Sequence, residues 1–117
     1  MEECTMITEI TSQNFNEEVL NSNTPVFACF TASTCGTCFA LHLVLEDLVK
    51  QYEERVKFVM INVEKEPLLA TKYNILPLPA MLVFRDAEPV IRTLGFQVKS
   101  ALSIMLDSVL TGNEKRT

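Results

Sequence analysis

One apolar run limits the folds open to this chain more than any other segment. Val26 to Thr31 is apolar without alternation, a pattern typical of a central β-strand covered on both faces. After a short polar break, apolar residues recur at spacings of three and four from Cys38 onward, at Leu41, Leu45, Leu48 and Tyr52. This spacing predicts a helix with one buried face. A covered strand that leads directly into such a helix indicates a sheet enclosed between helix layers.

The other apolar patterns predict an alternation of strands and helices that ends in a hairpin. Further strands are expected at Met6 to Ile10, Lys57 to Val63, Ala80 to Phe84 and Pro89 to Leu94. Further helices are expected from Thr11 to about Ser22, from Pro67 to about Lys72, and along a stripe of Val98, Ala101, Leu102, Met105 and Val109. Strand–helix–strand units place strands parallel, whereas a hairpin places them antiparallel. We therefore expect an α/β fold with a mixed sheet of roughly four to five strands, flanked by about four helices.

The length and charge of the chain restrict its organisation and its partners. With 117 residues, 48% of them hydrophobic, one domain over residues 1–112 can bury a sufficient core, and the polar residues 113–117 form a tail. A net charge of -5 opposes binding to phosphate backbones and to anionic lipid head groups. We therefore expect neither nucleic acid nor membrane partners. Residues 1–4 lack the basic and apolar regions of a secretory signal, which predicts a cytoplasmic protein, and we expect a monomer.

Two cysteines lie in the break between the central strand and its helix. The sequence there is Cys35-Gly36-Thr37-Cys38. The N–H groups of a first helical turn have no partner inside the helix, and the helix dipole adds partial positive charge, so both would stabilise a thiolate at Cys35. Cys38 lies within reach of a mixed disulfide formed at Cys35 and could resolve it. The motif therefore predicts dithiol–disulfide exchange, with an inert pair of thiols as the alternative.

Other cysteine and histidine residues offer competing interpretations. A structural zinc site needs four ligands, and outside the motif the candidates are Cys4, Cys29 and His42, without finger-like spacing, so we expect no metal. Cys29 lies inside the apolar strand, which predicts a small core residue. His42 follows Cys38 by one helical turn, as a base would, but it shares a polar face with Glu46. We expect a solvated surface histidine there.

These features, in this order along the chain, resemble the thioredoxin family over residues 6 to 110. The resemblance rests on Phe27 to Phe30 ahead of the Cys-Gly-Thr-Cys motif, on Val59 to Val63, on the segment Tyr73 to Ala80, and on Gly95 before the last helix. It implies a thioredoxin fold. It also implies that Cys35 is the attacking thiol and Cys38 the resolving thiol, with Gly36 and Thr37 as the residues between them that stabilise the thiolate.

The resemblance further implies a surface for partner proteins. Pro79 corresponds to the proline that follows a cis peptide bond in this family. A cis bond at Leu78–Pro79 would turn the chain beside the cysteines and leave the Leu78 backbone free to pair with an extended partner segment. Thr34 and Gly95 would complete this substrate-binding surface.

The chain departs from the family at positions that bear on mechanism. Cys29 and Met60 occupy the places of a buried aspartate and a lysine. Cys38 must lose a proton to resolve a mixed disulfide, and without the aspartate that proton must leave through water, the departing thiolate or Cys35. We therefore expect slower resolution than in an ordinary thioredoxin. Thr37 replaces a proline, and its N–H and hydroxyl would add donors near the Cys35 sulfur, which makes the pair more oxidising.

The function that follows is enzymatic. We expect a protein thiol–disulfide oxidoreductase that reduces disulfides in partner proteins and needs no bound cofactor. The resemblance implies recharging by an NADPH-dependent flavoprotein reductase. A thioredoxin-fold adaptor with little turnover is the alternative, and a thiol oxidant, supported by Thr37, is a third interpretation.

Overall fold

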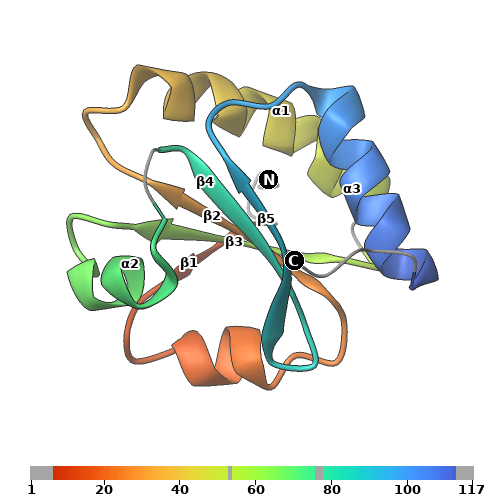
Figure 1. The fold of residues 1–117 in the computed structure, drawn as a ribbon, viewed down its shortest axis with the longest axis horizontal. Helices are drawn as coiled ribbons and strands as arrows, with labels where there is room; N and C mark the ends of the chain where they lie inside the picture. Colours follow the sequence, from red (N-terminus) through yellow and green to blue (C-terminus); the bar gives the residue numbers. More distant parts are fainter. Residues whose placement is uncertain (1–6, 53, 76–77, 113–117) are drawn as a thin grey trace, which may run out of the picture.

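A five-stranded mixed sheet organises the chain, with helices on both of its faces (Figure 1). The computed structural model describes residues 7–52, 54–75 and 78–112; Met6 and the expected tail 113–117 lie outside these ranges. The strands follow the order β1-β3-β2-β4-β5, with β1, β3 and β2 parallel and β4 and β5 antiparallel to their neighbours. The predicted α/β fold is confirmed. Its elements are β1 (Ile7–Ile10), the π-helix η2 (Asn16–Leu20), β2 (Val26–Thr31), α1 (Gly36–Tyr52), β3 (Lys57–Asn62), α2 (Pro67–Tyr73), β4 (Ala80–Arg85), β5 (Glu88–Leu94) and α3 (Lys99–Thr111).

Strand β2 lies at the centre of the sheet and contributes to two separate hydrophobic clusters. Phe27 and Cys29 pack in the cluster beneath α1 and α3, whereas Phe30 packs in the cluster on the opposite face, with residues of η2 and α2. Because both faces are covered, the strand needs apolar side chains at every position. The register places Cys29 opposite Met60 of β3 on one side and Met81 of β4 on the other.

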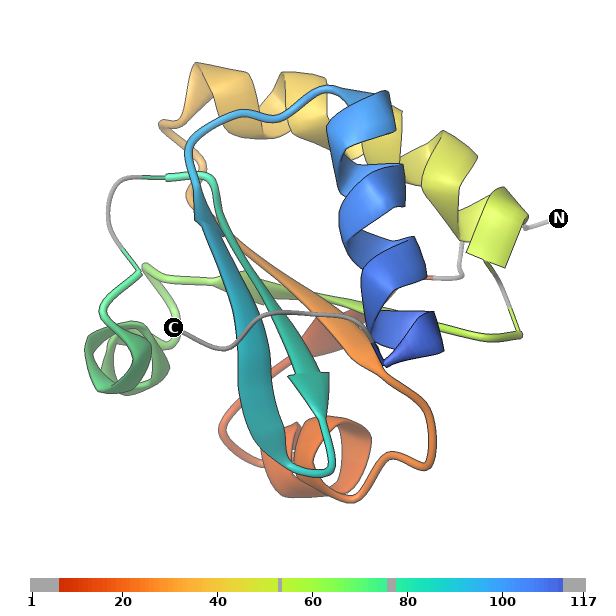
Figure 2. The same ribbon diagram turned by 45° about the vertical axis from the view of Figure 1, so that its right-hand side comes forward.

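Helices α1 and α3 cover one face of the sheet, and η2 and α2 the other (Figure 2). The buried face of α1 contains the predicted stripe together with Val49. For α3 the prediction was wrong at Val98, whose side chain is 57% exposed, because it precedes the helix with an extended backbone. Leu106, which the predicted stripe omitted, is buried instead. Leu102 and Leu106 lie four positions apart and therefore share the buried face of α3.

The segment expected to be a helix from Thr11 to about Ser22 instead forms a capped turn that leads into η2. Thr11 Oγ1 accepts the Gln13 N–H at 3.2 Å, and Asn14 Oδ1 accepts the Thr11 N–H at 2.7 Å, a reciprocal pair like a capping box. The Asn21 N–H then donates to Asn16 O, five residues back. Apolar spacing does not distinguish this wider turn from an α-helix, since Phe15 is buried in either case.

The predicted hairpin joins β4 to β5 through a two-residue turn. Asp86 and Ala87 have φ angles of 55° and 71°. Positive φ at both central residues is the mark of a type I′ turn, whose twist matches that of the strands. Pro89 follows in β5, an edge strand, where the missing N–H of proline is tolerated.

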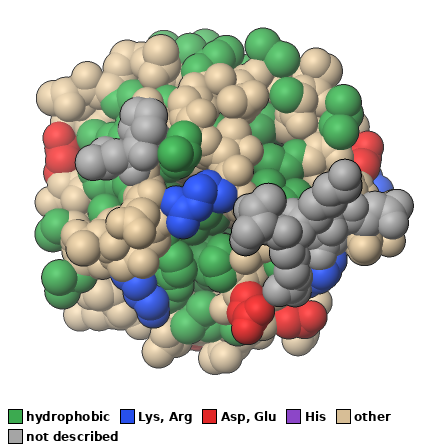
Figure 3. Space-filling model, viewed as in Figure 1, with side chains coloured by type: hydrophobic (Ala, Val, Ile, Leu, Met, Phe, Trp, Pro, Cys, Tyr) green, Lys and Arg blue, Asp and Glu red, His purple; other side chains and the backbone are tan. Residues whose placement is uncertain are grey.

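The surface mixes apolar and polar side chains. On the face drawn in Figure 3, hydrophobic side chains lie in several small groups between polar ones, including along its upper part. Within the described ranges, none of the helices combines the length and the apolar character needed to cross a membrane.

Candidate redox site

The two motif cysteines lie where β2 gives way to α1, as the sequence predicts. Cys35 directly precedes α1 and Cys38 lies in its first turn; their sulfurs form a disulfide, with the Cα atoms 5.2 Å apart. The loop before them is held to the β3–α2 connection, because Ser33 Oγ donates to Glu64 Oε1 at 2.9 Å. This contact fixes the approach of the chain to the helix start.

The environments of the two cysteines differ. Cys35 is partly exposed, whereas Cys38 is 5% exposed. The Cys38 N–H donates to Cys35 Sγ at 3.2 Å, and Thr37 Oγ1 lies 3.5 Å from the same sulfur. After reduction both groups would donate to a thiolate at Cys35, in addition to the helix dipole. The more exposed cysteine is therefore the one whose sulfur has nearby donors, and the Thr37 hydroxyl lies where the sequence predicted a donor.

The residues expected to bind partner segments come together at the same end of the sheet. The Leu78–Pro79 peptide bond is cis, which confirms what the family resemblance implied. The Gly95 N–H donates to Pro79 O at 2.8 Å, and Gly95 itself has a φ of 88°, a conformation that favours glycine. The start of β4, the end of β5 and the start of α1 lie together in both ribbon views (Figures 1 and 2). Thr34 is exposed directly before the disulfide.

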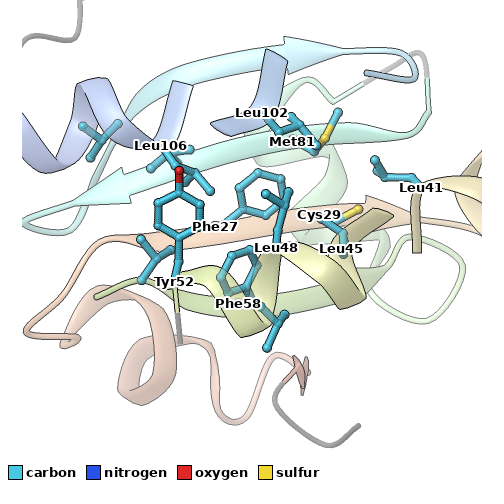
Figure 4. Close-up of a cluster of buried hydrophobic side chains, with 14 of the residues drawn as sticks. Phe27, Cys29, Leu41, Leu45, Leu48, Tyr52, Phe58, Met81, Leu102 and Leu106 are labelled. Atoms are coloured by element: carbon cyan, nitrogen blue, oxygen red, sulfur yellow. The ribbon is translucent and has the colours of Figure 1, made fainter. Parts of the chain in front are cut away.

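Cys29 is a core residue, as the sequence predicts. It is fully buried, with Leu41, Leu45 and Met81 around it in the cluster beneath α1 (Figure 4). Burial disfavours the charged thiolate and raises the pKa of Cys29 to about 12. A thiol of this kind is neither a nucleophile nor a proton acceptor at neutral pH.

His42 is a surface residue that pairs with Glu46 on the polar face of α1, as the sequence predicts, but it also lies near the cysteines. Four residues advance a helix by about 40° beyond a full turn, so His42 lies beside Cys38 rather than opposite it. Its side chain is 40% exposed, and Nε2 lies 3.4 Å from Glu46 Oε2. His42, Cys35 and Cys38 all line one surface hollow. The spacing of four residues was the sequence signal for this arrangement.

The hollow beside the disulfide has a volume of about 240 Å³ and is also lined by Thr31 and Met60. Sequence reasoning treated Met60 as the replacement of a family residue and Thr31 as the end of the central strand, and it did not find that either borders the site. Among the residues that the structure describes, no group of three or more His, Cys, Asp and Glu side chains could hold a metal ion. Cys4, one of the ligands considered for zinc, lies outside the described ranges.

Known proteins share this architecture and sequence pattern. A family model described as Thioredoxin matches residues 6–108. Thioredoxin C-2 of Corynebacterium nephridii is 39% identical over 101 residues, which cover 86% of this chain and 94% of that protein. Thioredoxin 1 of Synechococcus elongatus is 34% identical over the same length and shares of each chain. The thioredoxin of Pyropia yezoensis is 31% identical over 105 residues, or 90% of this chain and 98% of the relative.

Proposed function

Because the chain belongs to the thioredoxin family, we propose that this protein thiol–disulfide oxidoreductase attacks its substrates through Cys35 and resolves them through Cys38. The Cys35 thiolate attacks a disulfide of a partner protein, forms a mixed disulfide and releases one partner thiolate. Cys38 then bonds to the Cys35 sulfur, and the second partner sulfur leaves. The partner disulfide gains two electrons and two protons, and the dithiol becomes the Cys35–Cys38 disulfide.

The difference between the two sulfurs is the observation that carries this assignment of roles. Cys35 is partly exposed, and the Cys38 N–H and the Thr37 hydroxyl lie at hydrogen-bonding distance from its sulfur, whereas Cys38 is 5% exposed. A nucleophile must be accessible and favoured as the thiolate. A resolving thiol needs access only to the neighbouring sulfur, so burial is compatible with that role.

Leu78, Pro79, Thr34 and Gly95 are proposed to position the partner. The cis bond and the Gly95–Pro79 hydrogen bond support this role, since they fix the backbone at the end of the sheet where α1 begins. An extended partner segment could add to the Leu78 backbone like an additional strand, which gives affinity with little preference for sequence.

The proposal extends to the direction of electron flow and to the cellular setting. Residues 1–112 act as one domain that reduces partner disulfides in the cytoplasm, and an NADPH-dependent flavoprotein reductase returns the site to the dithiol. Support for this setting comes from the family resemblance. The contact between Thr37 and Cys35 favours a second candidate, a thiol oxidant, because a stabilised thiolate makes the couple more oxidising.

Two serine variants test the assigned roles. Cys38→Ser should accumulate a stable mixed disulfide between Cys35 and a disulfide-containing substrate protein, because resolution is blocked. Cys35→Ser should form no such adduct. Mass spectrometry of the alkylated adducts gives the site directly. An adduct on Cys38 in the Cys35→Ser variant, at a rate equal to that of Cys38→Ser, would reverse the two roles.

A further inference from the structure

Two adjoining hollows, together called the groove below, extend from the disulfide past His42 to β1 at the edge of the sheet. The hollow beside Cys35 and Cys38 shares three lining residues, Thr31, His42 and Met60, with a second hollow of about 290 Å³. The second hollow is also lined by Glu9 of β1 and Asn62 of β3. Both volumes far exceed the roughly 10–15 Å³ that a cavity needs to hold one water molecule. The groove therefore connects the buried resolving cysteine to solvent, with the imidazole at the junction.

His42 and Cys38 line the same hollow and lie one helical turn apart on α1. His42 follows Cys38 by four residues, a spacing that brings two helix side chains to about 5–6 Å at their Cβ atoms. Glu46 follows by another four, and its carboxylate lies 3.4 Å from His42 Nε2. A carboxylate on one ring nitrogen holds the ring in one orientation. The order along one edge of α1 is thus thiol, imidazole, carboxylate.

We propose that His42 accepts the Cys38 proton during resolution, through water in the groove, with Glu46 as a positioning residue. The inference rests on the proposed roles of Cys35 and Cys38. As the Cys38 sulfur bonds to Cys35 and the bond from Cys35 to the partner sulfur breaks, the thiol proton passes to the imidazole. It then leaves along the groove, or neutralises the partner thiolate. In the reverse direction, the imidazolium returns the proton to Cys38 when the disulfide is reduced.

The route through His42 provides a proton acceptor for Cys38 that the buried core does not contain. Cys29 and Met60 stand opposite each other where the family resemblance implies a buried charged pair, and Cys29 is fully buried as a neutral thiol. A proton acceptor for Cys38 must therefore come from elsewhere. Among the residues that the structure describes, Glu46 on the same helix contacts His42, Glu9 lines the second hollow with it, and Lys65 pairs with Glu9 at 3.7 Å.

A two-step reaction with dithiobis(nitrobenzoate) separates attack from resolution. The reduced protein, carrying Cys4→Ser to remove a competing thiol, is mixed with this aromatic disulfide in a stopped-flow spectrometer. Attack by Cys35 releases one thionitrobenzoate, and resolution by Cys38 releases a second at a rate independent of reagent concentration. Thionitrobenzoate leaves as a stable thiolate that takes up no proton near neutral pH. The Cys38 proton must therefore find another acceptor.

Three variants of α1 then test the proposal. General acid–base assistance is worth about 100-fold or more, and bulk water replaces part of it, so His42→Gln should slow the second phase by about tenfold or more. Glu46→Gln should have a smaller effect on the same phase. Asp47→Asn removes a charge from an exposed neighbouring position and should change neither phase. The second phase of His42→Gln should be slower than that of the wild type across neutral pH, and the difference should narrow at alkaline pH, where hydroxide can take the thiol proton.

The outcomes distinguish a failure of the proton route from a failure of the roles proposed for Cys35 and Cys38. A second phase in His42→Gln within about twofold of the wild type between about pH 6 and pH 9 would overturn the proton route. Equal slowing of both phases would also overturn it, because it would show a general disturbance of the helix. Release of a single thionitrobenzoate by the wild type would contradict the assignment of Cys38 as the resolving thiol, and the proton route with it.

Discussion

The buried thiol of Cys29 should make the stability of the folded protein depend on pH in the alkaline range. Burial raises its pKa from the ordinary value of 9.0 to about 12. Between these two pKa values the unfolded chain releases the thiol proton while the folded chain retains it. Unfolding therefore becomes more favourable as pH rises. The stabilisation that comes from keeping the Cys29 thiol neutral is fully present below about pH 9 and is lost between about pH 9 and pH 12. The whole loss is about 4 kcal/mol, and about 1.4 kcal/mol of it falls between pH 8 and pH 10.

The matched variant Cys29→Ala isolates this contribution, because every other titrating group is common to both proteins. Urea unfolding of both, with all thiols kept reduced, gives the difference in free energy of unfolding at each pH. We expect the advantage of the wild type over Cys29→Ala to shrink by about 1.4 kcal/mol from pH 8 to pH 10. A difference that stays constant over this range would refute the reasoning. It would mean that the thiol ionises freely in the folded protein, and that the core beneath α1 is open to solvent.

Three further substitutions follow from local structure. Ala87→Gly should raise the free energy of unfolding by about 0.5–1 kcal/mol, because Ala87 has a φ of 71°. The control Ala101→Gly, inside α3, should lower the free energy of unfolding. A lower value for both variants would contradict this account of the turn. Tyr52→Phe should cost about 1 kcal/mol in urea unfolding, because the Tyr52 hydroxyl donates to Asp107 Oδ1 at 2.7 Å; an unchanged midpoint would show that this bond contributes nothing. Thr37→Val should make the reduction potential more negative by about 20 mV, since it removes a weak donor to the Cys35 thiolate; a shift to less negative values would exclude that role.

Most of the fold could be predicted because apolar periodicity reports burial directly. Val26–Thr31 and the stripe from Cys38 to Tyr52 have the burial that their patterns indicate. The errors occurred where periodicity carries no information. Hydrogen bonds, not side-chain spacing, decide between a π-helix and an α-helix after Thr11. The N-terminal boundary of α3 depends on the extended backbone of Val98, which an apolar side chain does not reveal.

The candidate site was predictable where the chemistry lies within a few residues of sequence. Cys35, Cys38 and Thr37 are close neighbours along the chain, so the motif itself predicts their proximity. The surface position of His42 follows from its polar neighbours along α1, and its spacing of four residues from Cys38 places it beside the motif. The groove could not be predicted at all, since Met60 and Glu9 reach it from two other strands. Tertiary packing alone brings these strands beside α1.

Titration of the Cys35–Cys38 couple against dithiothreitol or glutathione buffers tests the central claim most directly. The fraction of disulfide at each buffer potential is read by alkylation and mass spectrometry. The account predicts a reversible two-electron transition close to about -270 mV, displaced toward less negative values by the Thr37 hydroxyl. A midpoint near about -120 mV would contradict a reductase and favour an oxidant. A disulfide that does not cycle at any accessible potential would contradict the redox function itself.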